Sequence, residues 1–450
     1  MFTHFPFRLY NTALTVSAPL WLGYYGLRAL RRRRDWRHLR ERFVPQLSAA
    51  PTPTIWFHCV SVGEVLAGQP LAQALRERLP RAHFVISTTT ETGQARAREQ
   101  LDWMGRHFYF PLDLPWVTER ALAALKPALV VILETEIWPN FLHACAQRGI
   151  PVVLANGRLS DRSFVRYRCL GSAMGDLLCR FTLCLMQSDE DAARIIALGA
   201  PPARVITTGN LKYAPPDATE QRRRDRIAAD LQRQFSLGDG RPCIVAGSTV
   251  EGEEVILAEV FAQLRMTPAL KPCRLLLAPR HPERFASVGR ELRRFGWRIA
   301  RRTQPRSDDA QAEVILLDTI GELAAAYRWA DVAFVGGSLV PRGGHNILEP
   351  AAAGRPVVTG PYTENFRAIM DRFCAADAVW RLAPGPVDAL RRDLAAALET
   401  LLTNPAHAAA LGRRAQATWA QAASAVAATL AALETHVFPT LPALAAIQGD

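Results

Sequence analysis

A carboxylate that could act as a base follows the first of the short, β-rich apolar runs of the chain. Glu64 closes the segment Ser61–Glu64, which comes shortly after the run Thr54–Cys59. At a junction between a strand and a helix, a carboxylate can accept the proton of an attacking hydroxyl. We expect Gly63 to allow the tight turn at this junction. In the alternative, structural interpretation Glu64 only complements the positive N-terminus of the following helix, and the motif alone leaves both roles open.

Further charged residues follow later apolar runs in the same way. Glu134 and Glu136 come directly after Leu129–Leu133, and a charge at the end of a buried strand is costly unless it binds or catalyses something. Arg158 and Lys212 also follow apolar runs and could hold a carboxylate or a phosphate group. Each of them could be a surface ion-pair partner, but several such residues at strand ends together favour a binding site.

The second half of the chain carries residues suited to a nucleotide. Arg280 and Arg284 follow an apolar run and could bind phosphate. The glycine-rich segment Val335–Leu339 is followed by Gly343–Pro350, and such glycines let a ligand approach the backbone. The N-terminus of the next helix suits a phosphate or diphosphate group. Glu349 can accept hydrogen bonds from both hydroxyls of a ribose.

The spacing of the apolar runs predicts a scaffold that brings these strand ends together. Short β-rich runs alternate with helical stretches such as Leu71–Leu79 and Trp138–Arg148, which predicts parallel sheets of βα units. Ligands of such sheets bind at the carboxyl ends of the strands. The expected strands are Thr54–Cys59, His83–Ser87, Leu129–Leu133, Val152–Ala155, Leu183–Met186, Val205–Thr207, Cys243–Ala246, Arg274–Ala278, Val314–Leu317, Val332–Val335 and Pro356–Thr359.

A polar, charged interval divides these strands into two series. It runs from Pro215 to Arg241 and predicts an α/β protein with two doubly wound, Rossmann-like domains that face a cleft. The expected parts are an anchor with a basic segment at residues 1–42, a first domain at 43–214, a linker at 215–241, and a second domain with a helical tail at 242–450.

Composition and charge exclude several classes of protein. With 450 residues, 49% hydrophobic and 21% charged, the chain has an ordinary globular composition. Its 54 basic and 42 acidic side chains give a net charge of +12, yet residues 1–42 alone hold nine arginines and two acidic residues. A nucleic-acid-binding protein more often spreads its basic residues over a surface, so we expect a membrane as partner and no nucleic acid. The eight cysteines include no Cys-x-x-Cys pair, which predicts reduced thiols and no metal.

The amino-terminal segment has the character of a membrane anchor. Leu9–Leu27 is a run of 19 residues without a charge, which as a helix would be roughly 28 Å long. The arginine-rich segment Arg28–Arg42 follows it, and positive residues stay on the cytoplasmic side. We therefore expect a single anchor, spanning or half-embedded, with the body of the chain at the cytoplasmic face of the inner membrane. The alternatives are a helix buried in the protein and, with a poorer fit, a cleaved signal peptide.

Taken in order, the motifs resemble those of the 3-deoxy-D-manno-octulosonic acid (Kdo) transferases of lipid A assembly, which are glycosyltransferases of the GT-B fold. The similarity extends from the apolar anchor to about Arg372, whereas the tail from roughly Pro384 adds nothing to it. The matching motifs are Ser61–Glu64, Glu134–Asn140, Gly209–Lys212, Ala278–Phe285 and the stretch from Val335 to Glu349.

The resemblance implies transfer of Kdo from CMP-Kdo to a sugar hydroxyl of a lipid A precursor (lipid IVA), with inversion at the anomeric carbon. Glu64 matches the family's catalytic glutamate, and Glu134 and Lys212 match positions that support the transition state. No metal or other cofactor is expected, and CMP-Kdo is the donor substrate. The residues that match the CMP-binding segments are Pro279, Arg280, Ile320, Gly321, Glu322, Asn346, Ile347, Leu348 and Glu349.

Two alternatives remain at this point. Another GT-B enzyme, either a UDP-sugar transferase or a nucleotide-sugar epimerase, would share the glycine-rich turn and Glu349 but not the combination of an anchor with Ser61–Glu64. A non-catalytic, membrane-bound scaffold could keep the fold and bind a nucleotide. It would have no need of a base, so Glu64 and Glu134 argue against it.

Overall fold

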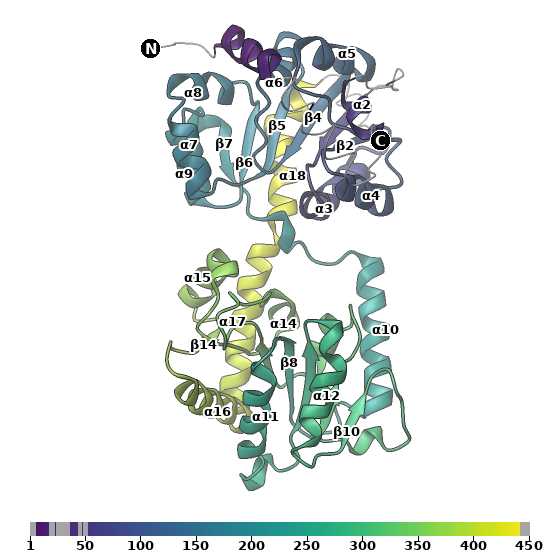
Figure 1. Cartoon of the computed structure of the whole chain (residues 1–450), viewed down its shortest axis with the longest axis vertical. Helices are drawn as coiled ribbons and strands as arrows, with labels where there is room; N and C mark the ends of the chain where they lie inside the picture. The colour runs from purple at the N-terminus through teal and green to yellow at the C-terminus, as the bar shows by residue number, and fades with distance from the viewer. Residues whose placement is uncertain (1–5, 18–22, 24–36, 44–46, 48–52, 442–450) are drawn as a thin grey trace. The chain divides into compact units, whose positions relative to one another are not determined.

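The computed structural model describes residues 6–17, 23, 37–43, 47 and 53–441. The chain divides into two compact units, one made of Met1–Ala214 with Ala422–Asp450 and the other of Pro215–Gln421. Each unit is built on a seven-stranded sheet whose paired strands run parallel (Figure 1).

The sheet of the first unit has the strand order β3-β2-β1-β4-β5-β6-β7. Its strands are β1 (Thr54–His58), β2 (His83–Thr88), β3 (Arg106–Tyr109), β4 (Pro127–Leu133), β5 (Val152–Gly157), β6 (Leu183–Met186) and β7 (Val205–Thr207). Its helices are α2 (Arg37–Phe43), α3 (Val62–Arg78), α4 (Glu91–Gln100), α5 (Pro115–Leu125), α6 (Pro139–Gln147), α7 (Asp161–Arg168), α8 (Ser172–Leu178), α9 (Asp189–Ala197) and α18 (Ala425–His436).

Strands β1 and β4 of the first unit are apolar on both faces because each face of the sheet is covered by helices. Ile55 and Phe57 lie in one core with residues of α3 and α18, whereas Trp56 lies in a second core with residues of α5 and α6. Successive side chains of a strand point to opposite faces, so a strand buried on both sides reads as a continuous apolar run. This arrangement exposes only the strand ends, where the charged motifs lie.

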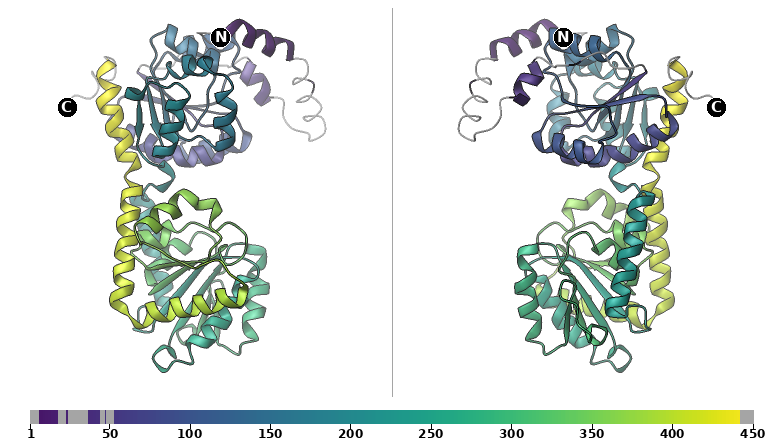
Figure 2. Two further views of the ribbon diagram at one scale, coloured as in Figure 1. Left: turned by 90° about the vertical axis from the view of Figure 1, so that its left-hand side faces the viewer. Right: turned by 90° about the vertical axis from the view of Figure 1, so that its right-hand side faces the viewer.

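The second unit repeats this layered design with the strand order β10-β11-β9-β8-β12-β13-β14, and helices cover both faces of its sheet (Figure 2). Its strands are β8 (Cys243–Thr249), β9 (Arg274–Pro279), β10 (Ile299–Arg301), β11 (Val314–Leu316), β12 (Val332–Val335), β13 (Val357–Thr359) and β14 (Trp380–Arg381). Its helices are α10 (Ala218–Phe235), α11 (Glu253–Leu264), α12 (Phe285–Arg293), α13 (Leu323–Ala326), α14 (Leu348–Ala352), α15 (Arg367–Ala375), α16 (Val387–Thr403) and α17 (Pro405–Ala423).

Two segments lie in units other than those expected from the sequence. The interval 215–241, expected as a linker, contains α10, whose Leu231 and Phe235 are fully buried in a core of the second unit. The end of the expected second domain contains α18, whose Leu433 lies in the core of the first unit. Both differences have one cause: a few apolar side chains on one face of a helix suffice to dock it, even when most of its residues are polar or alanine.

The start of the expected anchor packs against the first unit. Residues 7–17 are helical; the hydroxyl of Tyr10 donates to Asp113 at 2.9 Å, and the amide of Asn140 donates to Asn11 at 2.6 Å. Among the described residues no helix has the length and apolar character needed to cross a membrane. The rest of Leu9–Leu27, apart from Gly23, lies outside the described residues. Residues 7–17 contact the first unit without being buried in it, and Leu9 and Val16 are exposed.

Candidate active site

Glu64 lies in the first turn of α3, next to the carboxyl end of β1. Its side chain is almost fully buried, with the residue 7% exposed. One carboxylate oxygen accepts a hydrogen bond from the backbone N–H of Val60 at 2.7 Å, and the other accepts one from the hydroxyl of Ser61 at 3.0 Å. Burial raises the pKa of this carboxyl and the charge of Glu134 raises it further, against the lowering effect of these hydrogen bonds and of Lys212. Glu64 therefore holds the N-terminus of α3 through these hydrogen bonds, and its raised pKa is also suited to a general base.

Glu134 and Lys212 form an ion pair next to Glu64. The ammonium of Lys212 lies 2.8 Å from a carboxylate oxygen of Glu134, which follows β4 with a left-handed φ of 56°. Asn156, at the end of β5, accepts a hydrogen bond from the N–H of Leu211 at 2.9 Å. The side chain of Asn210 accepts one from the N–H of Lys212 at 3.0 Å. Residues in or after three different strands thus hold the lysine beside the glutamate.

Glu136 adds a third carboxylate to this cluster. Its pKa is raised to about 7, first by burial and then by the charges of Glu64 and Glu134. The structure therefore brings together the three residues predicted for catalysis, Glu64, Glu134 and Lys212, and adds Glu136 as a group that titrates near neutrality. In the sequence, Glu136 is the second of two carboxylates that follow Leu129–Leu133, and this position after a buried strand is the signal that could have indicated its role.

Gly63 does not have the conformational role expected of it. It lies within the first turn of α3, and a Cβ there would meet nothing nearer than the Ser61 hydroxyl oxygen at 3.8 Å. The crowded glycine near this helix is Gly93, where a Cβ would lie 2.8 Å from Oγ1 of Thr90 and 3.2 Å from the carbonyl oxygen of Val60. The tight turn predicted at Gly63 is absent because the helix already begins at Val62.

The glycine-rich turn after β12 is closed by a carboxylate of the protein itself. Glu253 is fully buried and accepts hydrogen bonds from the N–H groups of Gly337 at 2.7 Å, Ser338 at 2.9 Å and Leu339 at 2.8 Å. A Cβ on Gly336 would lie 2.6 Å from the carbonyl oxygen of Ser248. These three N–H groups are therefore not available to a ligand, because Glu253 already accepts their hydrogen bonds; the N-terminus of the helix that follows is the part expected to suit a phosphate.

Arg280 and Glu349 are two charged residues of the second unit that stay open to a ligand. The backbone N–H of Arg280 donates to Thr249 at 2.9 Å, while its exposed guanidinium has no hydrogen bond or ion pair with any described residue. Arg284, by contrast, is bound to Glu254 through two contacts of 2.7 and 3.2 Å. Burial raises the pKa of Glu349, against the charges of Arg224 and Arg280. The arginine and the carboxyl therefore lie near each other.

The remaining predicted CMP-binding residues differ in their availability. Ile320 is 64% exposed, and Gly321 adopts a φ of 85° beside Arg223. Glu322 is bound by Arg302 through contacts of 2.8 and 3.0 Å, so its carboxylate already has a partner. The others take backbone or packing positions: Pro279 ends β9, Asn346 accepts the N–H of Leu348 at 3.0 Å, and Ile347 and Leu348 are buried.

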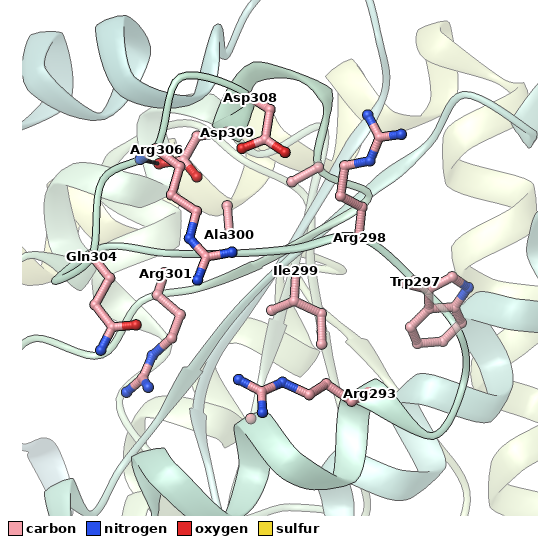
Figure 3. Close-up of a pocket in the computed structure, with 12 residues that line it drawn as sticks. Arg293, Trp297, Arg298, Ile299, Ala300, Arg301, Gln304, Arg306, Asp308 and Asp309 are labelled. Carbon is pink, nitrogen blue, oxygen red and sulfur yellow. Dashed lines mark hydrogen bonds between the residues drawn. The ribbon is translucent and has the colours of Figure 1, made fainter.

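A cavity of about 280 Å³ lies at the β10 edge of the second sheet, away from these residues (Figure 3). Arg293, Ile299, Arg306 and Asp308 are among its lining residues, and none of the predicted CMP-binding residues lines it. Within the described parts of the chain, no group of three or more His, Cys, Asp or Glu residues could hold a metal ion.

Comparison with known proteins settles the family. The family model described as 3-deoxy-D-manno-octulosonic-acid transferase (kdotransferase) matches residues 37–215. The chain is 37% identical over 398 residues to the 3-deoxy-D-manno-octulosonic acid transferase of Haemophilus influenzae, covering 88% of this chain and 90% of that protein. It is 38% identical over 441 residues to the enzyme of the same name from Bordetella pertussis, covering 95% and 98%.

The solved structures show how widely the fold is shared. UDP-GlcNAc 2-epimerase from Neisseria meningitidis, bound to UDP-GlcNAc, matches 85% of this chain and 100% of its own with a TM-score of 0.55, but with only 13% sequence identity. This likeness shows the fold alone, whereas the much higher identity to the two transferases decides against an epimerase. The chain therefore belongs to the 3-deoxy-D-manno-octulosonic acid transferase family and is a glycosyltransferase that transfers Kdo.

Proposed function

We propose that the chain transfers Kdo from CMP-Kdo to a sugar hydroxyl of a lipid A precursor, lipid IVA, with inversion, and that Glu64 is the general base. The observation that carries this proposal is the buried Glu64 carboxyl, whose pKa is raised at the end of β1. A sugar hydroxyl is a weak nucleophile until a base removes its proton. An isolated helix-capping carboxylate would need no such cluster of acidic neighbours, so the surroundings of Glu64 favour catalysis.

The neighbours of Glu64 suit the other charges of the reaction. Glycosyl transfer passes through a state in which the anomeric carbon becomes positive, and a nearby carboxylate such as Glu134 stabilises it. The ammonium of Lys212, 2.8 Å from Glu134, fixes that carboxylate and offers a positive charge to the acid group of Kdo. Glu134 and Lys212 therefore support the transition state, while Glu64 takes the proton.

Arg280 and Glu349 of the second unit suit the leaving nucleotide. The free guanidinium of Arg280 can offset the negative charge that develops on CMP, without a metal ion or another cofactor. Glu349 can accept hydrogen bonds from the ribose hydroxyls, since its carboxylate has no hydrogen-bond partner among the described residues. The exposed side chain of Ile320 offers an apolar surface to the nucleobase of CMP.

Replacing Arg280 by alanine should weaken CMP binding roughly ten- to hundredfold, because a charge-assisted hydrogen bond of about 1.5–3 kcal/mol is lost. Glu349→Ala should have a similar effect through the ribose hydroxyls. Calorimetric titration of CMP into each variant measures both changes. Arg290→Ala serves as the control, since Arg290 is an exposed arginine of α12 outside the proposed site. Unchanged affinity in both site variants would remove these residues from the donor site.

We also propose that the chain is held at the cytoplasmic face of the inner membrane by its uncharged segment Leu9–Leu27 and the arginines that follow. Deletion of residues 1–36 keeps α2, which contacts β3 of the first unit. The shortened protein should leave the membrane fraction in large part, and what stays bound should be released by salt, because salt screens attraction between exposed charges. If it sediments with membranes at high salt as fully as the intact chain, the anchor is ruled out.

A further inference from the structure

A large cavity lies at the amino ends of the strands in the second unit, opposite the end that carries Arg280. Its volume is about 790 Å³, which is within the range of small-molecule sites. Pro242, Asp331 and Pro356 line it directly before β8, β12 and β13, and residues of α16 and α17 line it as well. Substrates of open α/β sheets bind at the carboxyl ends of the strands, so this cavity is separate from the donor site.

The cavity is strongly basic. Arg241, Arg328, Arg355 and Arg413 line it, with Asp331 as the one acidic lining residue. Arg241 is paired with Asp239 at 2.6 Å, and Arg328 is paired with Asp225 at 3.2 Å. Arg355 and Arg413 form no ion pair with any described residue. Two positive charges of the lining are therefore left without a direct counterion.

Arg355 is placed as a ligand-binding guanidinium rather than as a surface charge. One of its terminal nitrogens donates to the backbone carbonyl of Arg328, while its Nε is buried and has no hydrogen-bond partner among the described residues. Burial lowers the pKa of Arg355, and the charge of Arg328 lowers it further, against the charge of Asp331. An oxyanion in the cavity would offset the charge of this guanidinium.

The rest of the lining is apolar. The indole N–H of Trp329 donates to the carbonyl of Ala228 at 3.0 Å, so the polar edge of the ring is satisfied within the protein. Leu401 and Leu402 at the end of α16 and Pro405 at the start of α17 contribute aliphatic surface. A small inorganic anion would leave this surface in contact with water, whereas a ligand with a hydrocarbon part would cover it.

We propose that this cavity binds an amphiphilic anion, with its phosphate or carboxylate head on Arg355 and Arg413 and its hydrocarbon part against Trp329 and Leu402. The cavity at the β10 edge is a useful contrast (Figure 3). It is smaller, and two aspartates line it alongside its arginines. Four arginines against these two aspartates leave its lining basic as well, so it offers a matched arginine, Arg293, for a control.

The test is a calorimetric titration of the full chain, saturated with CMP so that the donor site is occupied. The probes are butyl phosphate, butyrate, inorganic phosphate and butanol. Butyl phosphate or butyrate should bind at least about tenfold more tightly than inorganic phosphate, since the butyl group buries apolar surface. Which of the two binds better identifies the head group. Butanol should bind far more weakly, because it carries no charge.

Three variants separate the contributions to binding. Arg413→Ala should lower the affinity for butyl phosphate and for inorganic phosphate at least about tenfold. Leu402→Ser should lower the affinity for butyl phosphate and leave the affinity for inorganic phosphate unchanged. Arg293→Ala should bind both as the intact chain does. Arg413 is exposed, so its removal leaves the fold intact, and circular dichroism confirms this for each variant.

Several outcomes would overturn the proposal. Wild-type affinity in Arg413→Ala would mean that the arginines of the cavity do not hold the anion. An equal loss in Arg293→Ala would mean that the probes bind to basic surface in general. Equal affinity for butyl phosphate and inorganic phosphate, or for butyl phosphate and butanol, would contradict an amphiphilic ligand.

Discussion

Glu64→Gln should lower the turnover of Kdo transfer at least about a hundredfold, because general bases contribute 10²–10⁴-fold and glutamine cannot accept a proton. The amide keeps the size of the side chain and can still accept the N–H of Val60, which lies 2.7 Å from the carboxylate. CMP binding and the melting temperature should therefore stay near those of the intact chain. Rates are measured with CMP-Kdo and a lipid A precursor, and the lipid product is weighed by mass spectrometry.

The pH dependence of turnover provides a second readout of Glu64. The base must be ionised, and burial raises its pKa, so turnover should fall with decreasing pH already above the ordinary range of a glutamate, near 4.3. This acid limb should vanish in the residual activity of Glu64→Gln. Glu77→Gln is the matched control, since Glu77 is an exposed glutamate at the other end of α3.

A purely structural role for Glu64 predicts the opposite effects on turnover and melting temperature. A helix-capping carboxylate contributes about 0.3–1 kcal/mol to stability and nothing to the chemistry. Near-normal turnover together with a lowered melting temperature would then remove Glu64 from the mechanism. Glu134 would be the next carboxylate to test, because it also follows a buried strand and lies beside Lys212.

Glu253→Ala should destabilise the second unit by at least about 3 kcal/mol. The change leaves the N–H groups of Gly337, Ser338 and Leu339 buried without an acceptor, at a cost of about 1–3 kcal/mol each. For a unit of this size that corresponds to a fall in melting temperature of roughly 6–12 °C. Differential scanning calorimetry of the full chain measures it directly.

Glu251→Ala is the control for that experiment. Glu251 is an exposed acidic residue two positions before Glu253, so its removal changes the local charge but no buried hydrogen bond. An equal effect of the two substitutions would show that charge near the start of α11, rather than the hydrogen bonds to the turn, accounts for the loss. A melting temperature unchanged in Glu253→Ala would mean that the turn after β12 does not depend on this carboxylate.

The sequence predicted the central strands of both sheets because these strands are buried on both faces. Leu183–Met186 and Val332–Val335 have the predicted bounds, as does Val205–Thr207, a less buried strand at the edge of the first sheet. The strands that were missed, β3, β10 and β14, lie at sheet edges. Edge strands are only half covered, so they contain residues such as His107 and Arg301 and produce no apolar run.

The residues of the candidate site that follow a strand were predictable from the sequence. Hydrogen-bond partners that are distant in the sequence were not. Glu64, Glu134 and Lys212 each follow an apolar run, and parallel strands bring such ends to one edge of the sheet. No local pattern reveals that Glu253 would occupy a turn more than eighty residues further along the chain, or that Arg302 would bind Glu322. A glycine-rich turn that accepts a ligand and one that accepts the protein's own carboxylate look the same in sequence.

The position of α18 sets the order in which the protein can be completed during its synthesis. Residues of α18 and the segment after it, such as Leu433 and Phe438, share a core with Val65 and Leu71 of α3, the helix that begins beside Glu64. A chain still on the ribosome lacks them until residues 425–438 emerge, whereas residues 215–421 of the second unit emerge earlier and are already available to fold. The first unit is thus begun first and finished last. Until α18 emerges, the apolar face of α3 in a nascent chain is left uncovered and accessible to chaperones. Loss of α18 through a truncated messenger would therefore destabilise the first unit, although the deletion lies near the other end of the sequence.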